Sequence, residues 1–162
     1  MKNRIVFTYL IILLVMSSCQ NYDKPISIKN EKFEVVLPGF VQKEELAEDA
    51  ALEYANRFRN FYVVAFILKD NVSQDSLWAQ TTTRITSALM NPTVDSIHQP
   101  NHIFTKITGK FKDEKEPLYY SQKLIYRKGN SLLLTIWTRG KEREKKYEVE
   151  VERIMSSFKS MP

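Results

Sequence analysis

The sequence has little glycine, and the few glycines it has are isolated. A loop that cradles a phosphate needs several glycines close together, because its backbone must approach the ligand closely and turn tightly. No such cluster exists in the 162 residues. This excludes a glycine-rich nucleotide-binding loop. The four glycines are Gly39, Gly109, Gly129 and Gly140.

Cysteine and histidine are also scarce. The chain contains one cysteine, Cys19, so no disulfide can form within it. The two histidines, His98 and His102, are four residues apart, which would place both on one face of a helix. Pro100 lies between them and disfavours a regular helix there. We therefore interpret them as two solvated histidines in a loop.

An enzymatic alternative uses the same histidines. His98 and His102 could hold a metal ion together with a carboxylate such as Asp95. A histidine could also act as the base for Ser96 as nucleophile, although no glycine-flanked serine motif surrounds it. Our main expectation is a protein that is not an enzyme, with no catalytic residue, no metal site and no cofactor.

Charge of one sign does not gather along the chain. The net charge is +5, from 24 basic and 19 acidic residues. Without Lys2 and Arg4, which belong to the segment described next, 22 basic and 19 acidic residues leave a net charge of +3. A nucleic-acid-binding surface needs basic residues gathered on one face, so we expect no nucleic-acid partner.

The first eighteen residues have the pattern of a secretory signal. Lys2 and Arg4 precede an apolar run over residues 5–16, and two small residues, Ser17 and Ser18, follow it. As a helix, a run of this length reaches about 18 Å, whereas the hydrocarbon core of a bilayer is about 30 Å thick. The pattern therefore predicts a cleaved export signal rather than a permanent transmembrane anchor.

Met16-Ser17-Ser18-Cys19 resembles a lipobox, the signal at which bacterial lipoproteins are lipidated and cut. The resemblance implies cleavage before Cys19, a diacylglyceryl group on its thiol and an N-acyl chain. Two or more acyl chains hold a protein stably on a membrane. Met16 departs from the leucine that the family prefers, and the alternative is an ordinary signal peptide in which Cys19 is incidental.

The same resemblance predicts where the protein resides and how it is divided. Gln20 is not the aspartate that commonly retains lipoproteins in the inner membrane, so we expect a lipid anchor in the outer membrane of the cell envelope, facing the periplasm. We expect a signal peptide over residues 1–18, the lipidated cysteine and a tether over 19–30, and one domain over 31–160. A domain of this length can bury one core.

Hydrophobic periodicity predicts alternating strands and helices in this domain. A helix capped by Ser73 or Asp75 is expected to end at Asn91-Pro92, and a second helix is expected over 144–159. The short connection 128–130 contains Gly129 and indicates a hairpin. Strands are expected over 32–37, 51–57, 61–68, 103–112, 118–127 and 131–138.

This order predicts an α+β domain, with an antiparallel sheet of about six strands sandwiched by helices. It resembles the PsbP/Mog1-like fold over roughly residues 27–159, in its opening segment Phe33-Glu34-Val35-Val36-Leu37-Pro38-Gly39-Phe40, its long hairpin and its closing helix. Members of that α/β/α fold perform unrelated functions, so the resemblance implies a fold and no activity.

Aromatic residues on neighbouring predicted strands have two interpretations. They could line a ligand groove, or they could simply pack in the core and across strands. We expect a membrane-tethered, non-enzymatic binding or assembly module of the cell envelope, with an envelope protein as partner, acting through its sheet rim or a groove beside a helix. The aromatic residues are Tyr119, Tyr120, Tyr126 and Trp137.

Overall fold

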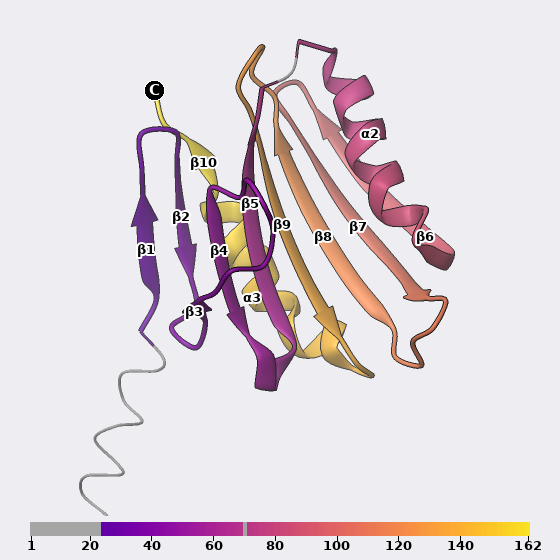
Figure 1. The fold of residues 1–162 in the computed structure, drawn as a ribbon. Helices are drawn as coiled ribbons and strands as arrows, with labels where there is room; N and C mark the ends of the chain where they lie inside the picture. Colours follow the sequence, from indigo (N-terminus) through magenta and orange to yellow (C-terminus); the bar gives the residue numbers. More distant parts are fainter. Residues whose placement is uncertain (1–23, 70) are drawn as a thin grey trace, which may run out of the picture.

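A computed structural model of the chain describes residues 24–69 and 71–162. Cys19 and the expected signal peptide lie outside the described residues. Within the described part, ten strands form two antiparallel sheets, accompanied by two α-helices and a short 3₁₀ helix (Figure 1). The predicted α+β class, an antiparallel sheet with helices on both faces, is confirmed.

The larger sheet has seven strands in the order β3-β4-β5-β9-β8-β7-β6. Every neighbouring pair is antiparallel. The strands are β3 (Gln42–Lys43), β4 (Leu52–Asn56), β5 (Phe61–Leu68), β6 (Leu89–Gln99), β7 (His102–Phe111), β8 (Leu118–Ile125) and β9 (Ser131–Arg139).

A smaller sheet of three strands lies beside it, in the order β1-β2-β10. Its central strand β2 (Phe33–Leu37) pairs with β1 (Ile26–Lys29) on one side and β10 (Lys159–Ser160) on the other. Residues 26–29 were expected to belong to the tether. They instead form strand β1, which pairs with β2 along its whole length.

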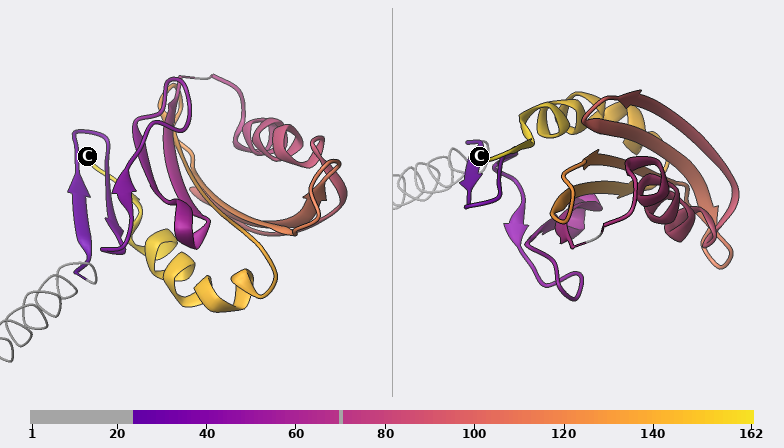
Figure 2. Two further views of the ribbon diagram at one scale, coloured as in Figure 1. Left: turned by 60° about the horizontal axis from the view of Figure 1, so that its bottom comes forward. Right: turned by 90° about the horizontal axis from the view of Figure 1, so that it is seen from above.

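The two helices cover opposite faces of the seven-stranded sheet. Figure 2 shows α2 (Gln74–Thr86) lying in the hollow of the curved sheet and α3 (Arg143–Ser157) on its other side. We call these the α2 face and the α3 face. The predicted second helix agrees with α3. The first helix begins after Ser73, whose side chain accepts a hydrogen bond from the backbone of Ser76, as predicted.

The main core lies between the α3 face and α3. Alternate residues of β5 and β9 point into it. The aromatic rings of Phe33 and Phe158 meet there at 5.5 Å, which joins the small sheet to the end of α3. Central strand β5 is apolar at every position and also buries Val64 on the opposite face.

Strand β6 is the main correction to the expected architecture. We expected the helix to run to Asn91-Pro92 and a loop to follow, whereas α2 ends at Thr86 and residues 89–99 pair with β7. Asn91 has a positive φ of 47°, and the register shifts between Met90 and Thr93, so Pro92 sits in a bulge. A bulge at a sheet edge tolerates the proline that we took as a helix stop.

Candidate functional site

A cavity of about 300 Å³ opens beside α2, on the α2 face of the sheet. It exists because α2 packs against β6 and β7, so the helix leaves the same face of β9 and β5 partly uncovered. This volume lies at the lower end of the range for small-molecule sites. The lining residues from the sheet are Val64, Phe66, Leu68, Tyr120, Leu133, Thr135 and Trp137, and the rim adds Ala47, Thr81, Arg84 and Ile85.

Tyr120 and Trp137 lie side by side in this lining. They are cross-strand partners on β8 and β9, so both side chains point to the same face. The indole of Trp137 also stacks on the ring of Tyr62, with centroids 5.2 Å apart and planes 8° apart. This stack holds the indole as a flat wall.

The structure brings together only part of the predicted aromatic groove. Tyr119 follows the alternation of β8 to the α3 face, where it lines a different crevice. Tyr126 stays on the α2 face, but its hydroxyl donates to the backbone carbonyl of Val72 at 3.0 Å and serves to hold the chain before α2. Tyr120 and Trp137 are therefore the two aromatic residues of that group that meet in the cavity.

The phenol of Tyr120 is a neutral polar group in an apolar setting. Burial raises its pKa well above the ordinary value of 10.0, while the side chain of Thr135 and the positive charge of Arg84 oppose that rise. The hydroxyl of Thr135 donates to the carbonyl of Val64 at 3.1 Å. The cavity thus presents a protonated phenol beside apolar walls.

Arg84 supplies the charge at the rim. Its side chain is exposed and forms no ion pair with any residue that the structure describes. The cavity lining within the described part contains no carboxylate to neutralise it. An unpaired guanidinium above an apolar cavity attracts an anionic group whose remainder is apolar.

A row of buried polar side chains continues from the cavity beneath α2. Thr105, Gln122 and Thr135 occupy matching positions on β7, β8 and β9. The amide nitrogen of Gln122 donates to Thr82 of α2 at 2.9 Å, and the indole nitrogen of Trp78 donates to Thr105 at 2.9 Å. These two bonds fix α2 on the sheet and so fix one wall of the cavity.

The two histidines are not in a loop, which corrects that prediction. His98 lies on β6 and His102 begins β7, within one hairpin. His98 pairs with Ile103, so its side chain faces α2, whereas His102 lies beside Lys123 and Met155 on the α3 face. With the sheet between the two imidazoles, they cannot bind one metal ion together.

His98 does meet Ser96 and Asp75. The Ser96 hydroxyl lies 3.2 Å from Nε2 of His98, and Nδ1 of His98 lies 3.8 Å from Oδ1 of Asp75. The second distance exceeds a hydrogen bond, and the side chains of His98 and Asp75 are 43% and 85% exposed. A catalytic triad instead holds its histidine between two hydrogen bonds, with the acid buried.

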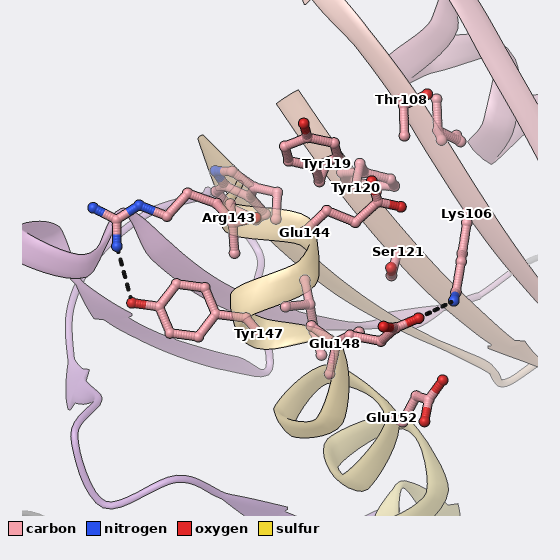
Figure 3. A pocket seen from close by; sticks show the side chains of 15 residues that line it. Lys106, Thr108, Tyr119, Tyr120, Ser121, Arg143, Glu144, Tyr147, Glu148 and Glu152 are labelled. Atoms are coloured by element: carbon pink, nitrogen blue, oxygen red, sulfur yellow. Dashed lines mark hydrogen bonds and ion pairs between the residues drawn. The ribbon is translucent and has the colours of Figure 1, made fainter. Parts of the chain in front are cut away.

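A second, narrower crevice lies on the α3 face. Figure 3 shows Lys106, Tyr119 and Ser121 of the sheet opposite the side chains of α3. Its volume is about 40 Å³, and Nζ of Lys106 lies 3.9 Å from Glu148 across it. Apart from water-sized molecules, this crevice has no room for a ligand.

Among the described residues there is no cluster of three or more potential metal ligands. No helix of the described part is long and apolar enough to span a membrane.

Solved structures resemble this architecture over most of the chain. The Ran-binding protein Mog1p of Saccharomyces cerevisiae is 11% identical with a TM-score of 0.61, covering 84% of this chain and 95% of that one. LpqN of Mycobacterium tuberculosis, involved in cell envelope biogenesis, is 11% identical with a TM-score of 0.55, covering 86% and 90%. Cyanobacterial PsbP of Synechocystis is 9% identical with a TM-score of 0.53, covering 85% and 92%. The chain has the Mog1/PsbP-like fold. Comparisons with protein-family models and with curated protein sequences give no match.

Within this Mog1/PsbP-like fold, the cavity depends on residues that sequence reasoning missed. Arg84 lies on the polar side of a helix, and nothing in its neighbours along the chain marks it as a rim residue. Phe66 and Leu133 belong to the predicted strands 61–68 and 131–138, which gave no sign of a cavity. Their cross-strand pairing brings them together beside α2. The detectable signal was the pair Tyr120 and Trp137, since both were assigned to neighbouring strands.

Proposed function

We propose that the protein is a lipid-tethered, non-enzymatic binding module of the cell envelope. In this proposal, the cavity beside α2 holds a small molecule with an apolar body and an anionic group. The observation that carries the proposal is the guanidinium of Arg84, which pairs with no described acid, at the rim of an apolar cavity of about 300 Å³. Two structural neighbours accord with such a role, since Mog1p is a Ran-binding protein and LpqN is involved in cell envelope biogenesis.

The shape and chemistry of the cavity assign roles to its residues. Phe66, Leu133 and the flat face of Trp137 contact the apolar body. The neutral phenol of Tyr120 donates a hydrogen bond, and Arg84 binds the anionic group in the solvent-facing part. A site of this kind positions and retains a molecule, and the arrangement requires no covalent step.

The ligand is tested with a fluorescent probe of the same chemistry. Anilinonaphthalene sulfonate combines aromatic rings with a sulfonate and becomes brighter in apolar sites. We expect Arg84→Ala to weaken its binding by about 10- to 150-fold, since a charge-assisted hydrogen bond contributes about 1.5–3 kcal/mol. Lys145→Ala is the matched control, because Lys145 is an exposed cation on α3, on the other face of the sheet. Equal binding by wild type and Arg84→Ala would remove Arg84 from the site.

The natural ligand is identified from protein made in its own cells. Native mass spectrometry of the gently extracted protein is expected to show an added mass that is lost in Arg84→Ala and retained in Lys145→Ala. Crosslinking in the same cells tests the complementary role, an envelope protein as partner. A protein crosslinked to the cavity rim, with no added small mass, would replace the small-molecule proposal.

The lipid tether is tested at Cys19. Cells expressing the wild-type protein are expected to incorporate labelled palmitate into it. Cys19→Ala is expected to abolish the label and either to release the protein from the membrane or to leave it there with its signal uncleaved. Cys19→Ser leaves a side chain of similar size without a thiol and serves as a second variant. Palmitate labelling that persists in both variants would end the lipoprotein proposal.

The contact between Ser96 and His98 favours one competing function, an esterase. It predicts that the protein hydrolyses an activated ester and that Ser96→Ala and His98→Ala each abolish the hydrolysis. Our proposal expects both variants to match the wild type, because His98 is open to solvent and is not held by Asp75 within hydrogen-bond distance. A defect confined to these two variants would favour the enzyme.

A further inference from the structure

The 3₁₀ helix η1 (Arg57–Arg59) presents an unusual side chain at one end of the domain. Phe58, at its centre, is 98% exposed, more than any other large hydrophobic residue of the described part. An isolated exposed apolar residue often has no role. The turn that carries Phe58, the charges around it and its position relative to the tether distinguish it from an ordinary exposed residue.

The turn that carries Phe58 is held firmly. The side chain of Asn56 accepts a hydrogen bond from the backbone of Arg59 at 3.0 Å and donates one to the carbonyl of Phe40 at 2.7 Å. Asn60 closes the turn with a positive φ of 48°, and its backbone nitrogen donates to Arg57. Phe58 therefore projects from a fixed tip and not from a loose loop.

Positive charge accompanies this tip. Arg57 and Arg59 flank Phe58 and are both exposed, and Arg57 pairs with Glu44 at 2.7 Å. The guanidinium of Arg59 lies 4.3 Å from the centre of the Phe40 ring and forms no ion pair with a described residue. A hollow beside Asn60 adds further side chains, namely Lys115, Glu116, Arg139, Lys141 and Arg143, four of them basic.

The chain enters the described structure at the same end. Ile26, the first residue of β1, pairs with Leu37, and three residues later Phe40 contacts the η1 turn. Figure 1 shows the start of β1 and the turn between β4 and β5 on the same side of the molecule, opposite the C-terminus. The seven residues from Cys19 to Ile26 can span at most about 25 Å. A lipid on Cys19 therefore keeps this end close to a bilayer.

We propose that the η1 tip is a membrane contact in which Phe58 enters the lipid interface and Arg59 and Lys141 face anionic headgroups. This inference rests on the proposed lipid tether, which supplies a high local concentration of membrane and makes a single aromatic residue sufficient. Aromatic residues favour the interfacial region, and basic residues are attracted to an anionic lipid surface. The contact orients the domain so that the opposite end, with the β8–β9 hairpin, points away from the membrane.

The test uses the lipidated protein, which begins at Cys19, in vesicles of phosphatidylethanolamine and phosphatidylglycerol. Lipidation occupies the one natural thiol, so an introduced cysteine takes a spin label alone. We expect a label at Phe58→Cys to collide more with oxygen, which concentrates in lipid, than with a water-soluble nickel chelate. The matched control is Lys128→Cys in the β8–β9 hairpin, where we expect the reverse. A label at position 58 that behaves like the one at position 128 overturns the proposal.

A second variant removes the apolar contact without moving the label. A label at Lys141→Cys is expected to lose its lipid exposure when Phe58→Asp is added, while Val149→Asp, another exposed apolar position, leaves it unchanged. No change with Phe58→Asp overturns the role of Phe58. Palmitate labelling of each sample separates the two proposals, since a labelled protein with a water-exposed tip contradicts the membrane contact alone.

Discussion

The ammonium of Lys123 on β8 donates a hydrogen bond to the backbone carbonyl of Phe158 at 2.9 Å. It donates another to the carbonyl of Met155 at 2.7 Å, so one strand side chain closes the carboxyl end of α3. The last carbonyls of a helix lack partners within the helix and carry partial negative charge. The ammonium is partly withdrawn from water where it makes these bonds, and this burial lowers the pKa of Lys123.

Lys123→Met is expected to destabilise the domain. Methionine can fill the space of the lysine stem but leaves the two carbonyls without their donor, which costs about 1–3 kcal/mol. Urea unfolding measures this change. Lys128→Met, at an exposed hairpin position, is the control and is expected to stay within about 0.5 kcal/mol of the wild type. Equal stability of the two variants would show that water replaces the ammonium at no cost.

The buried phenol of Tyr120 is expected to make the free energy of unfolding depend on pH in alkaline solution. Its pKa is raised in the folded state, so between about pH 10 and the higher folded value the unfolded chain loses the phenolic proton while the folded chain keeps it. Rising pH therefore favours the unfolded state through this group. Unfolding followed at about pH 8 and again above pH 10 is expected to show a smaller loss of stability in Tyr120→Phe than in the wild type. Parallel losses would contradict the burial of the phenol.

The buried amide of Gln122 suggests a pair of substitutions in which the second restores stability lost in the first. Its carbonyl oxygen is buried and accepts no hydrogen bond from any described residue, while its nitrogen donates to Thr82. Gln122→Met alone strands the Thr82 hydroxyl and is expected to cost about 1–2 kcal/mol. Adding Thr82→Val removes the stranded group and is expected to recover most of that loss. Thermal unfolding of Gln122→Met, Thr82→Val and the double variant measures the coupling between the two side chains. Effects that simply add would mean that the two side chains are uncoupled.

Phe158→Ala tests the junction between the two sheets. Phe158 is 1% exposed and packs against Phe33, which is fully buried. The lost contacts and the cavity left behind are expected to cost about 3–5 kcal/mol. Phe58→Ala is the natural control, because it removes the same side chain from an exposed position and is expected to change the free energy of unfolding little. Similar losses for both variants would mean that Phe58 packs inward.

The sequence predicted the elements whose residues are buried in a regular pattern. Strand β9 was assigned over 131–138 and spans Ser131–Arg139, because Leu132, Leu134 and Ile136 alternate with Leu133 and Trp137. Strand β6 gave no such signal. Except at Leu89 and Ser96, the side chains of β6 are exposed, so its sequence shows no alternation of apolar and polar residues. It is a strand because its backbone pairs with β7 at the edge of the sheet.

The candidate site was less predictable than the fold. Tyr120 and Trp137 could be placed on adjacent strands, and the alternation of β8 separates Tyr119 from them. The distance between Arg84 and Tyr120, in contrast, depends on how α2 docks on the sheet. That docking is fixed by contacts such as Trp78 with Thr105, which are 27 residues apart in the chain. Local sequence patterns cannot predict a contact between residues so far apart in the chain.

The small sheet around β2 can be completed only late in the synthesis of the chain. Its partners are β1 just before it and β10 at the far end of the chain, and the backbone of Val36 bonds to Ser157, 121 residues away. A chain made from its amino end therefore carries β2 with one edge open, and with Phe33 uncovered, until residues 157–160 have been added. Contacts of such long range form slowly. Loss of the last few residues would consequently unsettle the first strands to be synthesised rather than the neighbouring hairpins.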